Sequence, residues 1–237
     1  MREDICSIPI NEIFEPKDGC PYCRMRDMLE DRMATYITGA AMMEPDVRVE
    51  TNRLGFCETH LKAVLERGSR LSVALILQTL LYANAEEILP NEDKINVKKA
   101  TANADRREKS CFICENIDKN IDHLCATVLK LWQTEPEFRK LYSEQTHICL
   151  KHYNMIQKTG EKKMHKKVFA DFSKENHRLA RNYMDTLRHD IGHFCTMFDY
   201  RSKGKDWGNS RDAIERSIEF LTSRKPDTTT KTEGKNR

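Results

Sequence analysis

Eight cysteine and histidine residues stand in four closely spaced pairs. The CxxC and CxxH pairs are Cys20 with Cys23, Cys57 with His60, Cys111 with Cys114, and Cys149 with His152. Two residues between ligands let one turn of chain point both side chains at a single ion, and three thiolates with one imidazole are a common ligand set for Zn²⁺. Four protein ligands fill a tetrahedral shell and leave no position for water. The pattern therefore predicts two structural zinc ions per chain rather than catalytic ones.

The same pairs recur within an internal repeat. Residues 20–68 form the first copy and residues 111–160 the second. Each copy contains a CxxC pair, a helical pattern, an EPxxR segment ("EPDVR" or "EPEFR") and a CxxH pair. In both copies the proline of that segment lies 22 residues after the second cysteine of the CxxC pair. This agreement indicates that the chain arose by duplication.

Because each copy contains four ligands, the simplest arrangement is one metal site per copy. The first site would comprise Cys20, Cys23, Cys57 and His60, and the second Cys111, Cys114, Cys149 and His152. Pairing the CxxC of one copy with the CxxH of the other would use the same residues, and the spacing does not exclude it. An iron–sulfur cluster is the alternative cofactor, since three cysteines and a histidine can also hold one.

The tetrapeptide CPYC (residues 20–23) also resembles the redox motif of dithiol glutaredoxins. Those proteins place the motif after a β-strand and later carry a cis-proline segment, and the sequence shows neither feature. The second copy reads CFIC and lacks the proline. We therefore favour metal ligation, and we expect the Pro-Tyr pair between the two cysteines to be incidental to the ligand spacing. A thiol-redox or metal-responsive switch is the alternative.

The hydrophobic periodicity predicts an all-α protein, with helices after each CxxC pair and from each CxxH pair. Gly68 and Gly160 are expected to cap helix C-termini. The apolar run 71–83 is expected to be a buried core helix, and a short helix near 210–221 is expected to be capped by Asn209 or Ser210. The expected organisation is a first repeat (1–89), a charged linker (90–110), a second repeat with a long helix (111–200), a polar loop and short terminal helix (201–223), and a disordered tail (224–237).

Composition narrows the class of protein further. The 237-residue chain is 32% charged, and its apolar run 71–83 is shorter than the roughly 20 residues that a membrane span needs. With no secretory signal pattern at the N-terminus, we expect a cytoplasmic protein that does not contact membranes. Residues 158–237 contain 19 Lys and Arg against 12 Asp and Glu. A protein partner is expected, and nucleic acid is possible through this basic C-terminal third.

The other residues that could have a functional role give weaker signals than the CxxC and CxxH pairs. Cys125 and Cys195 are expected to be small core residues, Cys6 lies outside the repeat, and His189 and His193 are more typical of a surface pair than of a metal site. A cluster that could bind a partner comprises Tyr200, Arg201, Trp207 and Arg211. No nucleotide-binding loop or nucleophile motif is present, so we expect a non-enzymatic binding or regulatory module.

With "CPYC…EPDVR…GFCETH", "CFICE…EPEFR…CLKHY" and a final "FDYR…WGNSRDA", the chain resembles an uncharacterised bacterial family of unknown function. The resemblance extends to about residue 221. Members of that family have the same paired CxxC and CxxH motifs, which implies that all eight proposed ligands of this chain belong to the family pattern. Members of that family are sometimes labelled ABC-transporter substrate-binding proteins. The sequence gives this label no support, because it has no lipid-attachment cysteine and no α/β pattern.

Overall fold

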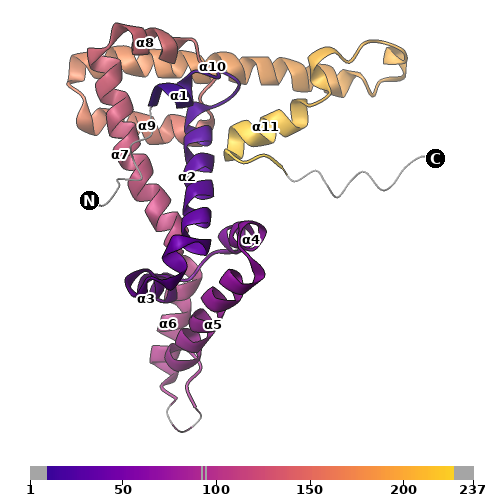
Figure 1. Ribbon diagram of the computed structural model, residues 1–237. Helices are drawn as coiled ribbons and strands as arrows, with labels where there is room; N and C mark the ends of the chain where they lie inside the picture. Colours follow the sequence, from indigo (N-terminus) through magenta and orange to yellow (C-terminus); the bar gives the residue numbers. More distant parts are fainter. Residues whose placement is uncertain (1–9, 92, 94, 227–237) are drawn as a thin grey trace. The chain divides into compact units, whose positions relative to one another are not determined.

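The computed structural model describes residues 10–91, 93 and 95–226, and its regular elements are helical (Figure 1). The α-helices are α1 (Ile10–Phe14), α2 (Pro21–Thr38), α3 (Pro45–Leu54), α4 (Glu58–Arg67), α5 (Arg70–Glu87), α6 (Val97–Lys109), α7 (Phe112–Thr134), α8 (Pro136–Ser143), α9 (Leu150–Lys163), α10 (Lys166–Thr196) and α11 (Ala213–Thr222). The short 3-10 helices are η1 (Ala40–Met43), η3 (Tyr200–Ser202) and η4 (Gly208–Ser210). No β-strand occurs among the described residues, which confirms the all-α prediction. Within the same residues, no helix has the length and apolarity needed to span a membrane.

The chain packs as two units. Among the described residues, unit 1 comprises 10–25 and 122–226, and unit 2 comprises 26–121 apart from positions 92 and 94. Both boundaries fall inside long helices, α2 and α7, so each unit contains residues of both repeats. The division therefore differs from the repeat-by-repeat organisation that the sequence suggested.

The core of unit 1 is an aromatic cluster. Phe14 from α1 lies edge-on to Tyr22 of α2, with ring centroids 5.9 Å apart, and stacks on Tyr142 of α8 at 5.6 Å. Phe172 of α10 contacts both Tyr142 and Trp132. Such aromatic pairs bury large apolar areas and have defined geometry, so they fix how α2 meets α8 and α10.

A chain of buried hydroxyl groups crosses this core. The Tyr142 hydroxyl donates to the Asn176 side-chain oxygen at 3.0 Å and lies 3.4 Å from the Tyr22 hydroxyl. Burial raises the pKa of both tyrosines above the ordinary range of a phenol. The hydroxyls are therefore neutral donors, and the Tyr22 hydroxyl is held at a defined place beside α8.

The residues inside the CxxC pairs are part of the two cores. Pro21 is the first residue of α2, where a proline fits because its fixed φ suits a helix start. Tyr22 is 1% exposed, and in the second repeat Phe112 and Ile113 are 8% and 0% exposed. The Pro-Tyr pair therefore has a packing role besides separating the two cysteines. These buried side chains anchor the turn that presents the cysteines.

In unit 2, the loop before α4 is tied to the start of α7. The Phe112 backbone N–H donates to the Gly55 carbonyl at 2.9 Å, and the Ser110 hydroxyl donates to the Leu54 carbonyl at 2.6 Å. Gly55 has φ 65°, a conformation that glycine adopts readily, and a Cβ there would lie 2.9 Å from the Arg107 side chain. These backbone contacts bring Cys57 close to Cys111.

Helix α5 is not the buried core helix that its composition suggests. Only Ser72, Val73, Ile76 and Leu80 of this helix are buried. These residues face α3, from which Arg48 donates to the Leu75 carbonyl. The opposite side of α5 is exposed, and no described element of unit 2 covers it.

Two helix boundaries also differ from expectation. The charged segment 90–110 contains a regular helix, α6, which has no buried residues and is capped by the Asn96 side chain. Gly160 lies within α9 instead of ending it, and a Cβ there would come within 3.1 Å of the Phe169 ring. Gly160 therefore permits a close approach between α9 and α10, whereas Gly68 caps α4 as predicted.

The C-terminal helices complete unit 1. Helix α11 packs on α10, where Arg216 forms an ion pair with the buried Asp190 at 2.9 Å. Helix α11 starts after Asp212, so neither Asn209 nor Ser210 is its N-cap. Most of the predicted disordered tail, from residue 227, lies outside the described residues.

Candidate metal centres

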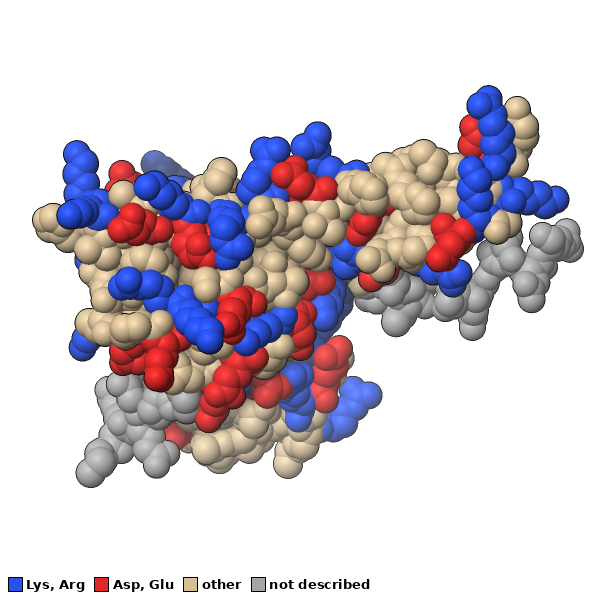
Figure 2. Space-filling view, turned by 90° about the horizontal axis from the view of Figure 1, so that it is seen from above, with Lys and Arg blue, Asp and Glu red and all other residues tan. Residues whose placement is uncertain are grey.

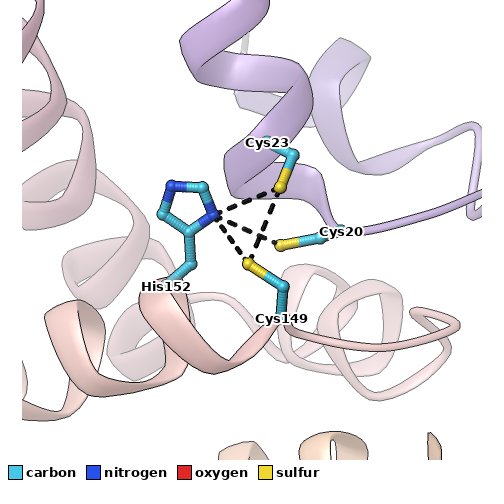
Figure 3. A group of neighbouring side chains, drawn as sticks. All are labelled: Cys20, Cys23, Cys149 and His152. Carbon is cyan, nitrogen blue, oxygen red and sulfur yellow. Dashed lines mark hydrogen bonds between the residues drawn. The ribbon is translucent and has the colours of Figure 1, made fainter. Parts of the chain in front are cut away.

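The first candidate metal centre lies in unit 1 and joins the starts of α2 and α9. We call it the α2/α9 site; its four residues are Cys20, Cys23, Cys149 and His152. Figure 3 shows the three sulfur atoms and the imidazole converging on one point. The Nδ1 atom of His152 lies 3.1 Å from Cys149 Sγ and 3.4 Å from Cys23 Sγ. All four side chains are buried, so a bound ion would be shielded from solvent.

The second candidate centre lies in unit 2 and joins the starts of α4 and α7. We call it the α4/α7 site; its four residues are Cys57, His60, Cys111 and Cys114. The Nδ1 atom of His60 lies 3.3 Å from each of the three sulfur atoms. Cys57 and Cys114 are partly exposed, so this site is more accessible than the α2/α9 site.

The distances fit a single tetrahedral ion in each site. In both sites the four ligand atoms lie within 4.8 Å of one another. With Zn–S and Zn–N bonds of ~2.3 and ~2.0 Å, a tetrahedron has edges of ~3.5–3.8 Å. The measured sulfur–sulfur separations are 3.6 Å for Cys23 to Cys149 and 3.9 Å for Cys57 to Cys114. Each cluster could therefore hold a metal ion with little movement of its ligands.

The grouping of the ligands is the opposite of the one expected. The CxxC of each repeat lies with the CxxH of the other repeat, so the expectation of one site per repeat is wrong. The physical reason is the helix that follows each CxxC pair. Helix α2 has 18 residues and α7 has 23, and helices of that size carry the chain about 27 and 35 Å along their axes. A CxxC at the start of such a helix is far from the residues that follow its end.

All four ligand pairs lie at helix N-termini. Cys57 and Cys149 are the N-cap residues of α4 and α9, and Cys20 and Cys111 immediately precede α2 and α7. The unpaired N–H groups and the macrodipole of a helix start favour negative charge. Each site therefore places its thiolates where two helix N-termini stabilise them.

The α4/α7 site contains an imidazole–thiolate pair when no metal is bound. Burial lowers the pKa of His60, but the hydrogen bond to Cys111 and the nearby Glu30 carboxylate raise it to about 10 overall. Burial raises the pKa of the Cys111 thiol, yet the hydrogen bond from His60 lowers it to about 6 overall. Burial and the adjacent Cys111 raise the pKa of Cys114 well above its usual range.

A carboxylate that the sequence did not single out supports His60. Glu30 Oε1 lies 3.4 Å from His60 Nε2, the nitrogen that faces away from the three sulfur atoms. Metal-binding histidines commonly give their second N–H to a carboxylate, which fixes the tautomer. Ile121 stands at the equivalent position of the second repeat, seven residues after its CxxC, so the duplication gave no signal for Glu30.

In the α2/α9 site, burial raises the pKa of the Cys20 thiol, and the neighbouring Cys149 and Cys23 raise it further. Cys20 in this site and Cys114 in the α4/α7 site therefore favour the protonated thiol when no metal is bound, whereas Cys111 favours the thiolate. Metal binding must displace these protons.

The other predicted cysteine and histidine positions do not join either site. Cys125 is fully buried, as expected, whereas Cys195 is exposed and the expectation of a core residue is wrong. Cys6 lies outside the described residues. His189 faces Asp190 at 3.4 Å and His193 faces the Asp206 carbonyl, so the two rings serve different contacts.

The predicted partner-binding cluster is a surface feature of unit 1. Tyr200 is 82% exposed and stacks beneath the Arg201 guanidinium, and Arg211 is also exposed. Trp207 is partly buried, with its ring centroid 5.4 Å from that of Phe194. The tryptophan therefore packs against α10 while the tyrosine and arginines face solvent.

Comparisons with known proteins give a family and a distant relative. A model of the Family of unknown function (DUF6062) matches residues 1–228. The Uncharacterized 23.9 kDa protein in xynA 3'region of Caldicellulosiruptor sp. (strain Rt8B.4) is 22% identical over 144 residues. That alignment covers 59% of this chain and 66% of the relative, slightly less than two thirds of its length. No solved structure matches the chain.

Paired substitutions distinguish the observed grouping from one site per repeat. We expect Cys23→Ser with Cys149→Ser to remove one metal ion per chain, because both residues belong to the α2/α9 site. Cys23→Ser with Cys57→Ser is expected to impair both sites. Metal content of the purified variants, determined by elemental analysis, checks this. The reverse outcome would support one site per repeat.

The pKa shifts predict that metal binding to the α4/α7 site releases protons. Near neutral pH the empty site holds a thiolate at Cys111 but protons on His60 and Cys114. A bound ion requires neutral imidazole and thiolates, so at least two protons leave and affinity should rise about 100-fold per pH unit. Calorimetric zinc titrations of metal-free wild-type chain, in buffers of different ionisation enthalpy, measure this release. Binding that is insensitive to pH would contradict the assignment.

Proposed function

Because the chain belongs to DUF6062, a family of unknown function, we propose a function from its own residues. We propose that it is a helical protein that binds two structural zinc ions and acts as a non-enzymatic binding or regulatory module. The observation that carries the proposal is the pair of Cys₃His clusters, each with four ligand atoms within 4.8 Å.

The ligand set favours zinc over an iron–sulfur cluster. Three thiolates and one imidazole on the edges of a single tetrahedron suit one Zn²⁺ ion. A cluster of several irons would hold some of its ligands further apart than the 4.8 Å within which all four ligand atoms lie here. Because protein atoms occupy all four positions, neither site offers a place for substrate, and the proposed role of the ions is structural.

Each proposed zinc ion would join segments that are distant in the sequence. The α2/α9 site connects residues 129 apart, from Cys23 to His152, and the α4/α7 site connects residues 54 apart, from Cys57 to Cys111. Free energy of metal binding at such sites becomes free energy of folding. Zinc would therefore stabilise both units and fix the positions of the helices that start there.

We propose a protein partner, with contact through the surface of unit 1 that carries Tyr200, Arg201 and Arg211. Figure 2 looks onto α8 and α10, where Lys and Arg lie among Asp and Glu instead of forming one continuous basic area. Nucleic-acid binding depends on a concentrated basic surface. The mixed charges of this face therefore favour a protein partner over nucleic acid. We also propose that the protein is located in the cytoplasm.

Metal removal tests the proposal. The purified protein is expected to contain about two zinc ions per chain, and chelation is expected to lower the melting temperature strongly, since structural sites of this kind contribute about 10 kcal/mol or more. Elemental analysis and circular dichroism before and after chelation measure both effects. A metal-free protein that melts cooperatively at the same temperature would refute the structural role.

The thiol switch is a second candidate, favoured by the exposure of one site. Cys57 and Cys114 are partly exposed and their sulfur atoms lie 3.9 Å apart. Hydrogen peroxide could take two electrons from these thiolates, forming one disulfide bond and two water molecules with two protons from solvent, and the ion would leave. The fully buried α2/α9 site would be protected.

Mild peroxide should therefore release about one of two zinc ions, and thiol reductant with added zinc should restore it. A chromogenic zinc chelator follows the release. Cys195→Ser serves as the control, because this exposed cysteine belongs to neither site and its loss should not alter zinc release. Equal release from both sites, or none, would contradict the switch.

A further inference from the structure

We propose that the exposed face of α5 binds a second copy of this chain in an antiparallel dimer. We call it the α5 face; its residues are Leu71, Ala74, Gln78, Leu81, Tyr82 and Ala85. All six are exposed, and α5 lies in unit 2 beside α6 (Figure 1). The proposal concerns assembly and does not depend on the proposed zinc function.

The composition of this face is unusual for a solvated helix. Leu71 and Tyr82 are each 68% exposed and Leu81 is 66% exposed. From residue 71 to residue 85 no side chain is charged, although the chain as a whole is 32% charged. A helix that is apolar on all sides is normally covered on all sides. Within unit 2, the described residues bury only one side of α5, so the other side is available to a partner.

The spacing of the α5 face is that of a helix–helix seam. Positions 71, 74, 78, 81 and 85 follow one another by three and four residues. This alternation is the a/d repeat by which two helices pack along their length. The expected partner is therefore another helix with a matching apolar face.

A second copy of α5 in antiparallel orientation meets this requirement. If a two-fold axis passes beside Gln78, residues equally far from position 78 on opposite sides lie level, so residue 71 meets residue 85 of the partner and residue 74 meets residue 82. Leu71 is then level with an alanine, and Ala74 with a tyrosine. Large side chains against small ones allow two helices to interdigitate.

The charges at the ends of α5 favour the same orientation. Arg70 stands at the N-terminal end and Glu86 near the C-terminal end, and neither forms an ion pair with another described residue. Antiparallel pairing brings the basic end of one helix beside the acidic end of the other and also opposes the helix dipoles. Parallel pairing would place like charges together.

The available area is sufficient for a modest dimer. The six exposed side chains offer roughly 600 Å² per protomer, or about 1,200 Å² in total when all of it is buried, which is the lower limit for specific interfaces. The area per protomer lies at the upper end of the roughly 300–600 Å² that the largest apolar patch of a monomer covers. We therefore expect an equilibrium between monomer and dimer.

Sedimentation velocity of the full-length, metal-loaded chain tests the proposal at concentrations from about 1 to 500 μM, a range chosen because interfaces of this size can be weak. The sedimentation coefficient should rise with concentration, and Leu81→Glu should weaken dimerisation about tenfold or more. Leu221→Glu is the matched control, since Leu221 is 57% exposed on α11. It should leave the dimer unchanged.

A charge exchange tests the orientation without disturbing the fold. Arg70→Glu alone should weaken the dimer several-fold, and adding Glu86→Arg should restore it. Both changes suit the helix dipole, so α5 itself should remain stable. A chain that is monomeric throughout, a dimer that is insensitive to Leu81→Glu, a dimer weakened equally by Leu221→Glu, or a double exchange that fails to restore dimerisation would overturn the antiparallel α5 dimer.

Discussion

The arrangement of this protein depends on bringing four ligand atoms within 4.8 Å of one another at two places. Each place requires two helix N-termini to meet, one presenting a CxxC pair and the other a CxxH pair. The helix starts supply partial positive charge that favours thiolates, and a bound Zn²⁺ ion would offset most of the negative charge of the three thiolates. Each unit therefore contains one place where helices from different repeats meet. The CxxC pair of each repeat lies with the CxxH pair of the other repeat.

The packing around each site explains how these meeting points are held. Tyr22, which lies between Cys20 and Cys23 in the sequence, packs in the aromatic core of unit 1. In unit 2, the backbone contact from Phe112 to Gly55 fixes α7 against the loop that leads to Cys57. Apolar burial thus positions the cysteines before any ion is considered, and metal binding and core packing favour the same geometry.

The two sites are built alike but differ in their surroundings. The α2/α9 site is buried throughout, whereas the α4/α7 site has two partly exposed cysteines and a carboxylate, Glu30, behind its histidine. Solvent access and a nearby carboxylate both change how readily a ligand gains or loses a proton or reacts with an oxidant. One duplicated motif therefore provides two clusters that differ in their exposure to solvent and in the groups behind the histidine.

The sequence alone determined the helical class and the eight cysteine and histidine residues of the two candidate sites, because hydrophobic periodicity and short residue spacing are local properties. It did not determine which pairs meet, since that depends on the lengths of α2 and α7 and on which helices pack at their ends. Nor could it show that Tyr22 anchors the core, that Glu30 reaches His60 or that α5 leaves one face uncovered. Each of these depends on which distant segment packs against a residue, and contacts between distant segments exist only in the tertiary structure.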